Sequence, residues 1–206
     1  MCVLRGRSFT KIKLISFFLL TIEHTTTKMP IKFIVENKKI NTLSYGAEGD
    51  YDPTELIAKC GIIRLMGQNL KCRKGVEFGA RVYNFIPYGG DAPPKLIEFL
   101  KHNKIPINKN TQIAIHFYEK GGSIGAHSDK VGKLIKNSKI YSISFLLDNH
   151  TSIMEWTHNR YIHKQRIKDK QIIVWDGTEH HQKKIKHSVK YSGRRINITV
   201  RQSRVD

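Results

Sequence analysis

The chain has 206 residues, 39% of them hydrophobic and 26% charged, which is enough for one domain with a hydrophobic core and excludes an intrinsically disordered protein. Lysine and arginine total 36 against 17 acidic residues, a formal net charge of +19. This excess favours a polyanionic partner, nucleic acid first and an anionic membrane second, although compositional drift toward lysine is an alternative explanation. Three cysteines, an odd number without metal-ligand spacing, predict an intracellular, reducing compartment such as the cytoplasm or nucleus and argue against secretion.

The first 28 residues have features of a targeting segment. Basic residues precede the apolar run LISFFLLTI at 14–22, but no small-residue cleavage site follows it. The run is too short to span a bilayer, so we expect no stable membrane association. Met29 then opens MPIKFIVENKK, which reads like a protein start. We therefore expect 1–28 to be an N-terminal extension, with a signal or anchor and a packed element as alternatives.

Two helices are predicted in the first half of the chain. Residues 52–68 begin with Asp-Pro and carry apolar residues at helical spacing, and residues 92–104 carry a pair of prolines, Pro93 and Pro94, after which the helical pattern starts. We expect residues 29–80 to form a helical or mixed flank, and residues 81–206 to form the core domain.

The pattern changes to short strands after residue 110. Five alternating or apolar runs are separated by Gly, Asp, Asn and Lys, and this regular spacing is typical of a β-sandwich or barrel. The five runs lie at 111–119, 139–148, 151–158, 170–177 and 195–201.

The first of these strands leads into the glycine-rich loop GGSIGAHSDKVG at 121–132. Residues two apart in an extended segment point to the same side, so His127 and Asp129 can converge on one point. The simpler interpretation of a lone His-x-Asp pair is that the carboxylate orients the imidazole. A second histidine, His187, follows in a basic context. Two histidines and one carboxylate are the ligand set of non-haem Fe(II) oxygen chemistry.

The last strand, RINITVR, places polar residues on one face and apolar residues on the other. Its polar face carries Arg195, Asn197, Thr199 and Arg201. Buried guanidinium groups need a counter-charge, and a bound dicarboxylate could supply it. A solvated basic face on an edge strand is the alternative.

His-x-Asp, a distant His and Arg-x5-Arg, in this order, resemble the AlkB-like family of Fe(II)- and 2-oxoglutarate-dependent dioxygenases. The resemblance covers residues 81–202 and includes RVYNFIPYGGDAPPKL, IHFYEKGGSIGAHSD, NSKIYSISF, HSV and RINITVR. The two-arginine strand distinguishes this family from other dioxygenases that share only the histidine–aspartate triad. The resemblance implies a mainly β fold, a double-stranded β-helix (jelly roll) with flanking helices.

The resemblance also implies a cofactor and a set of site residues. Fe(II) would be ligated by His127, Asp129 and His187, with 2-oxoglutarate and O2 as cosubstrates. Residues that would contact 2-oxoglutarate are Tyr118, Arg195, Asn197, Arg201 and His116.

The sequence departs from the family pattern at two positions. His116 stands where the family often has Asn, which puts one hydrogen bond to the cosubstrate in doubt. Val131 stands where a carboxylate is common, which weakens any inference about base discrimination. His180 and His181 are rivals of His187 for the third ligand position, but the HSV motif followed by the arginine strand favours His187.

The activity implied is oxidative demethylation of methylated bases in DNA or RNA by a monomer. A base held in a pocket stacks on aromatic rings, and the candidates, which are equally compatible with core positions, are Tyr83, Phe85, Tyr88 and Trp156. The basic stretches 158–170 and 180–206 predict a rim that contacts phosphates. The alternatives are a dioxygenase acting on a protein, and a basic nucleic-acid-binding protein on the same fold that has lost turnover.

Overall fold

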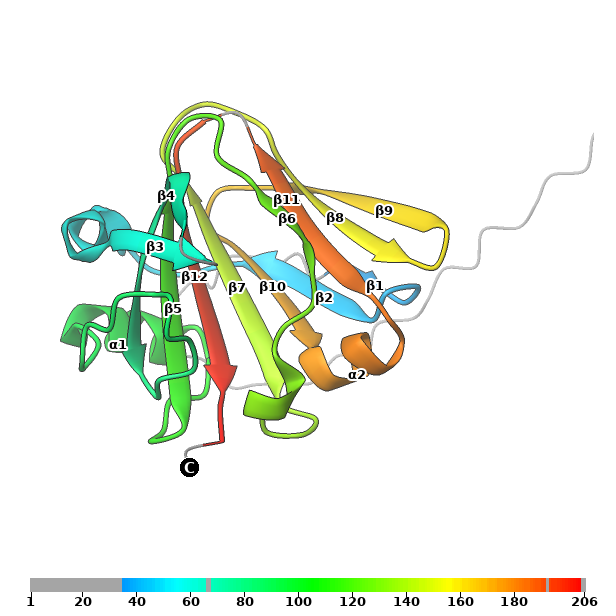
Figure 1. Ribbon diagram of the computed structural model, residues 1–206, viewed down its shortest axis with the longest axis horizontal. Coiled ribbons are helices and arrows are strands. Elements are labelled where there is room, and N and C mark those ends of the chain that lie inside the picture. The colour runs from blue at the N-terminus through cyan, green and yellow to red at the C-terminus, as the bar shows by residue number, and fades with distance from the viewer. Residues whose placement is uncertain (1–34, 66–67, 192, 205–206) are drawn as a thin grey trace, which may run out of the picture. The chain divides into compact units, whose positions relative to one another are not determined.

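The computed structural model describes residues 35–65, 68–191 and 193–204, so the predicted extension at 1–28 lies outside the described residues. Within them, two antiparallel sheets form a jelly roll (Figure 1). The larger sheet has the strand order β1-β2-β10-β7-β12-β5-β4-β3, and the smaller has the order β6-β11-β8-β9. The mainly β jelly-roll prediction is confirmed.

The larger sheet contains β1 (Val35–Asn37), β2 (Thr42–Gly46), β3 (Gly61–Leu65), β4 (Gln68–Gly79), β5 (Thr111–Tyr118), β7 (Lys139–Leu146), β10 (Gln171–Asp176) and β12 (Arg195–Gln202). The smaller sheet contains β6 (Ile124–His127), β8 (Ser152–His158), β9 (Tyr161–Ile167) and β11 (Lys186–Tyr191). The helical elements are α1 (Pro94–His102), α2 (Gly177–Gln182) and the 3-10 turns η1 (Pro53–Lys59) and η2 (Val131–Lys133).

Helix α1 packs on one face of the larger sheet, as the sequence predicts for 92–104. Its residues Leu96, Phe99 and Leu100 are buried with apolar side chains of β4, β5, β7, β10 and β12. The helix ends at Asn103, whose amide donates hydrogen bonds to the carbonyl oxygens of Phe99 (2.9 Å) and Glu48 (3.0 Å). This apolar layer leaves the opposite face of the sheet for polar side chains.

The opposite face of the larger sheet is partly covered by the smaller sheet. Met154 and Trp156 of β8 pack with Ile173 and Trp175 of β10 in a second buried cluster. Alternation along each strand sends these side chains inward while their neighbours point to the other side. Met154, Ile173 and Trp175 of this cluster also line a cavity.

The predicted helix over 52–68 is wrong in length. Asp52 caps the turn η1 by accepting a hydrogen bond from the Thr54 amide (2.9 Å), and the helical segment ends at Lys59. Strand β3 follows from Gly61, with Ile63 fully buried between exposed neighbours. β-branched residues with period-two burial favour a strand over a helix. Residues 35–79 thus supply four strands to the larger sheet, where a helical or mixed flank is predicted.

Two further observations concern the cysteines and the helices of the described residues. Cys60 is partly buried and Cys72 is exposed, and both are free thiols. None of the described helices combines the length and apolar character needed to cross a membrane.

Candidate metal and cosubstrate site

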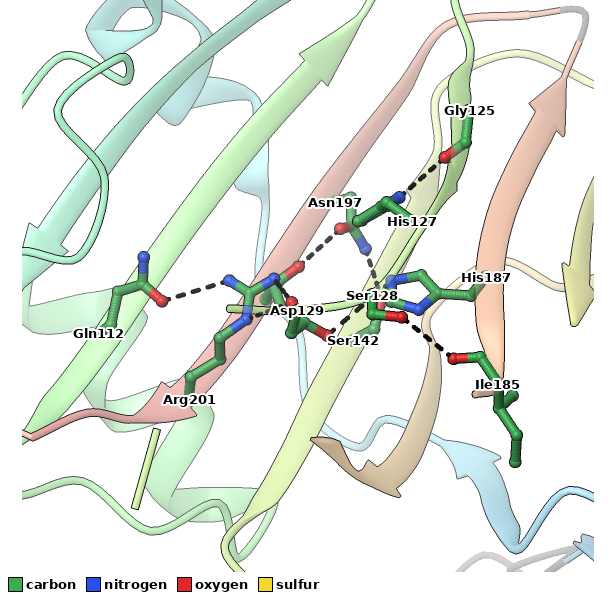
Figure 2. Close-up of polar contacts among 11 residues, drawn as sticks. Gln112, Gly125, His127, Ser128, Asp129, Ser142, Ile185, His187, Asn197 and Arg201 are labelled. Atoms are coloured by element: carbon green, nitrogen blue, oxygen red, sulfur yellow. Dashed lines mark hydrogen bonds and ion pairs between the residues drawn. The ribbon is translucent and has the colours of Figure 1, made fainter. Parts of the chain in front are cut away.

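His127 and His187 lie directly opposite one another on paired strands. His127 ends β6, His187 is the second residue of β11, and the two are register partners. Directly opposed residues of an antiparallel pair point to the same face, and the centroids of the two imidazole rings are 4.3 Å apart. Figure 2 shows both rings directed toward Asp129 and the arginine strand. The sheet register therefore brings together two ligands that are far apart in the sequence.

Asp129 completes the group from the loop after β6. Its Oδ1 accepts a hydrogen bond from Nε of Arg201 at 2.9 Å and forms an ion pair with Nη2 of the same residue at 2.6 Å (Figure 2). Its Oδ2 lies 3.9 Å from Nε2 of His187 and has no hydrogen-bond partner in the described part of the chain, although it is buried. One carboxylate oxygen is thus fixed by the arginine, and the other faces the histidine.

The ionisation states suit a divalent metal. Burial opposes ionisation of Asp129, but the charge of Arg201 and then the two imidazoles outweigh it and hold the pKa of the carboxyl below its ordinary value. Burial lowers the pKa of His187 to about 3 and also lowers the pKa of His127. Metals bind neutral imidazole and ionised carboxylate, so the three groups rest in the protonation states that ligation needs.

A backbone contact selects the tautomer of His127. Its Nδ1 lies 2.8 Å from the carbonyl oxygen of Gly125 (Figure 2). A carbonyl oxygen only accepts, so Nδ1 carries the proton and Nε2 keeps its lone pair. Metal-bound histidines commonly donate their second ring N–H in this way.

The candidate ligands have the chemistry of a metal site, but the distances between them are not those of a metal-bound group. No three His, Cys, Asp or Glu side chains in the described ranges stand at metal-ligand distances from one another. The orphaned Oδ2 of Asp129 and the donor set of two imidazoles and one carboxylate nevertheless fit the ligands of a non-haem Fe(II) site.

The arginine strand turns its polar face inward. Arg195 pairs in register with Tyr118 of β5, and its guanidinium carbon lies 4.7 Å from the centroid of the tyrosine ring. Arg195 is only 2% exposed, and its Nη1 donates to the hydroxyl of Ser144 at 3.3 Å. The alternative of a solvated basic edge is excluded, because β12 lies between β5 and β7 and Arg201 is buried as well.

Asn197 and His116 form the next row of the same face. They are register partners on β12 and β5. The Asn197 amide donates to the Ser142 hydroxyl (2.8 Å) and the Ile143 carbonyl (2.9 Å), and its oxygen accepts from Thr199 (2.9 Å). Burial, and then the nearby charge of Arg73, lower the pKa of His116 well below its usual value. His116 is therefore a neutral hydrogen-bonding group here.

One cavity of about 540 Å³ joins these parts. The predicted metal and cosubstrate residues that line it are His116, Tyr118, His127, Asp129, His187, Arg195, Asn197 and Arg201. The structure thus brings all eight together.

The predicted stacking residues divide into two groups. Tyr83 and Phe85 line the cavity, with ring centroids 5.0 Å apart. Trp156 is fully buried among Trp175, His180 and His187 and is not a lining residue, so its position does not fit the predicted stacking role.

Tyr88, the fourth aromatic candidate, is half exposed, and its hydroxyl donates to the carbonyl oxygen of Gly79 at 2.9 Å. It is not among the residues that line the cavity.

The rival histidines occupy different surroundings from His187. Asp176 caps the N-terminus of helix α2, and its side chain accepts a hydrogen bond from the Glu179 amide (2.9 Å). The helix places His180 against Trp156 and Trp175 of the second apolar cluster. His181 is exposed. Neither lines the cavity.

The sequence does not predict the part that three polar residues, Gln112, Glu77 and Arg73, play at the site. Gln112 accepts from Nη1 of Arg201 (3.2 Å) and donates to the buried carboxylate of Glu77 (Figure 2 shows the first bond). Arg73, on β4 opposite Tyr118, lines the cavity with its guanidinium carbon 5.9 Å from that ring. Gln112 shares the strand face of Tyr118, which is a usable signal, but nothing in the sequence pairs β4 with β5.

Comparison with known proteins identifies the fold. No family model matches the chain, and no curated protein matches its sequence. The structure of OsALKBH1 is similar, with a TM-score of 0.54 and 14% identity, covering 78% of this chain and 96% of that one. YcfD, a ribosomal oxygenase from Escherichia coli, matches with a TM-score of 0.31 and 13% identity over 46% of this chain and 23% of that one. The chain therefore has the jelly-roll fold of OsALKBH1, an AlkB homologue.

Proposed function

We propose that this protein is an Fe(II)- and 2-oxoglutarate-dependent dioxygenase that demethylates bases in DNA or RNA. The observation that carries the proposal is the convergence, in one cavity, of two histidines and an aspartate with an inward-facing arginine strand. Neither feature alone is specific, but a metal-ligand set beside a carboxylate-binding set is what this chemistry requires.

Each part of the site has a distinct task. His127, Asp129 and His187 would hold Fe(II), which when bound supplies the activation of O2 coupled to conversion of 2-oxoglutarate into succinate and carbon dioxide. Arg195, stacked against Tyr118, offers a bidentate donor to the distal carboxylate of 2-oxoglutarate. Arg201 holds Oδ1 of Asp129, so that Oδ2 remains directed toward the site.

Nucleic acid is the substrate class that the cavity and the charge support. Tyr83 and Phe85 line the cavity and present aromatic rings to a planar base. The formal net charge of +19 favours a polyanion. The AlkB-like motifs support the same class, and hydroxylation of an N-methyl group there would release formaldehyde and restore the base.

Succinate release tests the proposal. The protein with Fe(II) and 2-oxoglutarate is assayed against methylated and unmethylated single-stranded and duplex oligonucleotides of DNA and RNA, with a basic protein as the competing substrate class. We expect succinate release to rise with a methylated oligonucleotide and Arg195→Lys to raise the 2-oxoglutarate concentration required, since lysine lacks the bidentate fork. Stimulation by the protein substrate alone would favour the protein-modifying alternative, and binding without any turnover would favour the non-catalytic one.

A further inference from the structure

A second groove of about 600 Å³ lies beside the cavity. Phe85, Ile86 and Lys130 line both the groove and the cavity, so the two are contiguous. The remaining lining includes Ile62 and Arg64 of β3, the segment after β4, and Lys133 of η2.

The groove is strongly basic. Arg64, Arg81, Lys130 and Lys133 line it, and no acidic side chain is among its lining residues. The ion pairs found across the described ranges include none made by Arg64, Arg81 or Lys130. We call the groove that these four cations line the basic groove. Clustered like charges repel one another and raise the affinity for a polyanion.

Backbone hydrogen bonds help to position these cations, which come from three parts of the chain. The Arg64 amide donates to the Phe85 carbonyl at 3.2 Å, which joins β3 to the segment after β4. The Lys133 amide donates to the Lys130 carbonyl at 3.1 Å, which places both lysines on the turn that follows Asp129. The main chain therefore holds Arg64 beside the segment that carries Arg81, and it holds Lys130 and Lys133 on one turn.

Aromatic rings lie beside two of the cations. The Lys130 ammonium is 5.6 Å from the ring centroid of Tyr83 and 5.9 Å from that of Phe85, and the Arg81 guanidinium is 5.5 Å from that of Tyr88. Cations interleaved with aromatic faces are the arrangement that binds a polynucleotide strand, through phosphates and stacked bases respectively. An acidic peptide would satisfy the cations but would leave the rings without planar partners.

Three lysines of the basic stretches predicted from the sequence are less suited to this role. Lys183 is paired with Glu179 at 2.6 Å, and Lys164 and Lys190 share Glu155 at 3.8 Å and 3.1 Å. None of these three lysines lines the cavity or the basic groove.

We propose that the basic groove binds the phosphodiester backbone of a nucleic-acid strand beside the base that enters the cavity. The inference rests on the proposed function and adds the path of the strand. Phosphates would run along Arg64, Arg81 and Lys133, and Lys130 would stand at the junction where the strand turns toward Asp129.

A pair of double variants tests the path. Arg64→Gln with Arg81→Gln removes two groove charges, and Arg166→Gln with Lys186→Gln removes two exposed charges from β9 and β11 as the matched control. Binding of a fluorescent single-stranded oligonucleotide is measured at several salt concentrations. We expect the groove variant to bind about ten-fold more weakly at low salt and to lose about 1.5 units from the slope of log affinity against log salt. The control variant should bind as the unaltered protein does, and 2-oxoglutarate affinity, titrated by calorimetry with Mn²⁺ in place of iron, should be unchanged in both.

The failures of the two proposals can be told apart. Equal weakening by both double variants, with 2-oxoglutarate binding retained, would overturn the groove and leave the proposed function standing. Competition by polyglutamate but not by oligonucleotide would also overturn it, in favour of an acidic protein partner. Absence of 2-oxoglutarate binding in the unaltered protein would refute the proposed function, whatever the groove binds.

Discussion

The two carboxylate oxygens of Asp129 face two different residues. Oδ1 is held by Arg201 on the adjoining sheet, while Oδ2 faces His187. Arg201 is in turn hydrogen-bonded to Gln112, so the aspartate cannot rotate without breaking buried, charge-assisted bonds. At the scale of single residues, the candidate metal site is therefore held by the arginine strand, and the two motifs form one unit.

The ligand assignment predicts which histidine matters for metal. His127→Ala, Asp129→Ala and His187→Ala should each weaken Co²⁺ or Mn²⁺ binding by at least about 100-fold, because each removes a ligand from a set of three. His181→Ala, an exposed neighbour, is the matched control and should bind metal normally. Titration of the metal by absorbance or calorimetry gives the answer. Normal metal affinity in the His187 variant would return the third position to His180 or His181.

The site residues are predictable from the sequence where they sit in motifs, and unpredictable where only the register places them. His127, Asp129, Arg195 and Arg201 follow from spacing and alternation. The depth of Trp156 and the inward position of Arg73 depend on which strands pair, and no local pattern encodes that. A burial pattern alone cannot distinguish a core aromatic from a cavity aromatic.

Among the elements, β4 contributes more than the sequence indicates. It pairs antiparallel with β3, and it carries Glu77, whose carboxylate is fully buried. Glu77 accepts from the amides of Val82 (2.6 Å) and Tyr83 (3.2 Å) and from the Gln112 side chain. One strand thus fixes the start of the aromatic segment and, through Gln112 and Arg201, the position of Asp129.

Glu77→Gln tests both effects of β4, the one on the stability of the fold and the one on the position of Asp129. Glutamine keeps the shape but places an amide N–H₂ group among donors, so we expect a loss of about 1–3 kcal/mol in the free energy of unfolding. Metal affinity should also fall, since Gln112 loses the partner that orients it. Glu119→Gln, on an exposed pair with Lys74, is the control and should change neither quantity appreciably. Chemical denaturation and metal titration of both variants provide the measurement. Unchanged metal affinity in folded Glu77→Gln would show that Gln112 does not relay its position to Asp129.

The sequence patterns do not predict β3 and α2, because strand pairing and tertiary packing decide the conformation of these elements. The apolar residues of β3 also fit helical spacing and so predict the second half of a helix, whereas pairing with β4 decides the conformation. Helix α2 is a single short segment, and a Cβ at its Gly177 would lie 2.5 Å from Cδ1 of Ile140 and 2.9 Å from Cδ1 of Leu134, so these side chains would have to shift. Long, strongly patterned elements such as α1, β5 and β12 are predictable because local preference and tertiary packing agree there.

For the whole molecule, four buried or partly buried histidines predict acid sensitivity. Burial is the largest cause that lowers the pKa of each of four histidines, His116, His127, His180 and His187, the last to about 3. A histidine whose folded pKa lies below its unfolded value of about 6.5 takes up its proton more readily in the unfolded chain. The stability these residues give is therefore complete above pH 6.5 and is lost as the pH falls below it. Asp129 acts only at lower pH, because its folded pKa lies below its ordinary value.

We therefore expect the free energy of unfolding, measured by urea denaturation with a chelator present, to be level near pH 7.5 and to fall steadily from pH 6.5 to 4.5. Each buried histidine steepens the fall by up to about 1.4 kcal/mol per pH unit. His116→Asn should reduce the slope of the free energy of unfolding against pH by up to about 1.4 kcal/mol per pH unit, which is the contribution of one proton. The exposed control His181→Asn should leave this slope unchanged. A saturating divalent metal should hold His127 and His187 neutral and reduce the fall, because protons and metal compete for the same nitrogens of these two residues. A pH-independent free energy of unfolding across this range would contradict the prediction, because it would mean that these four histidines titrate in the folded protein as they do in the unfolded chain.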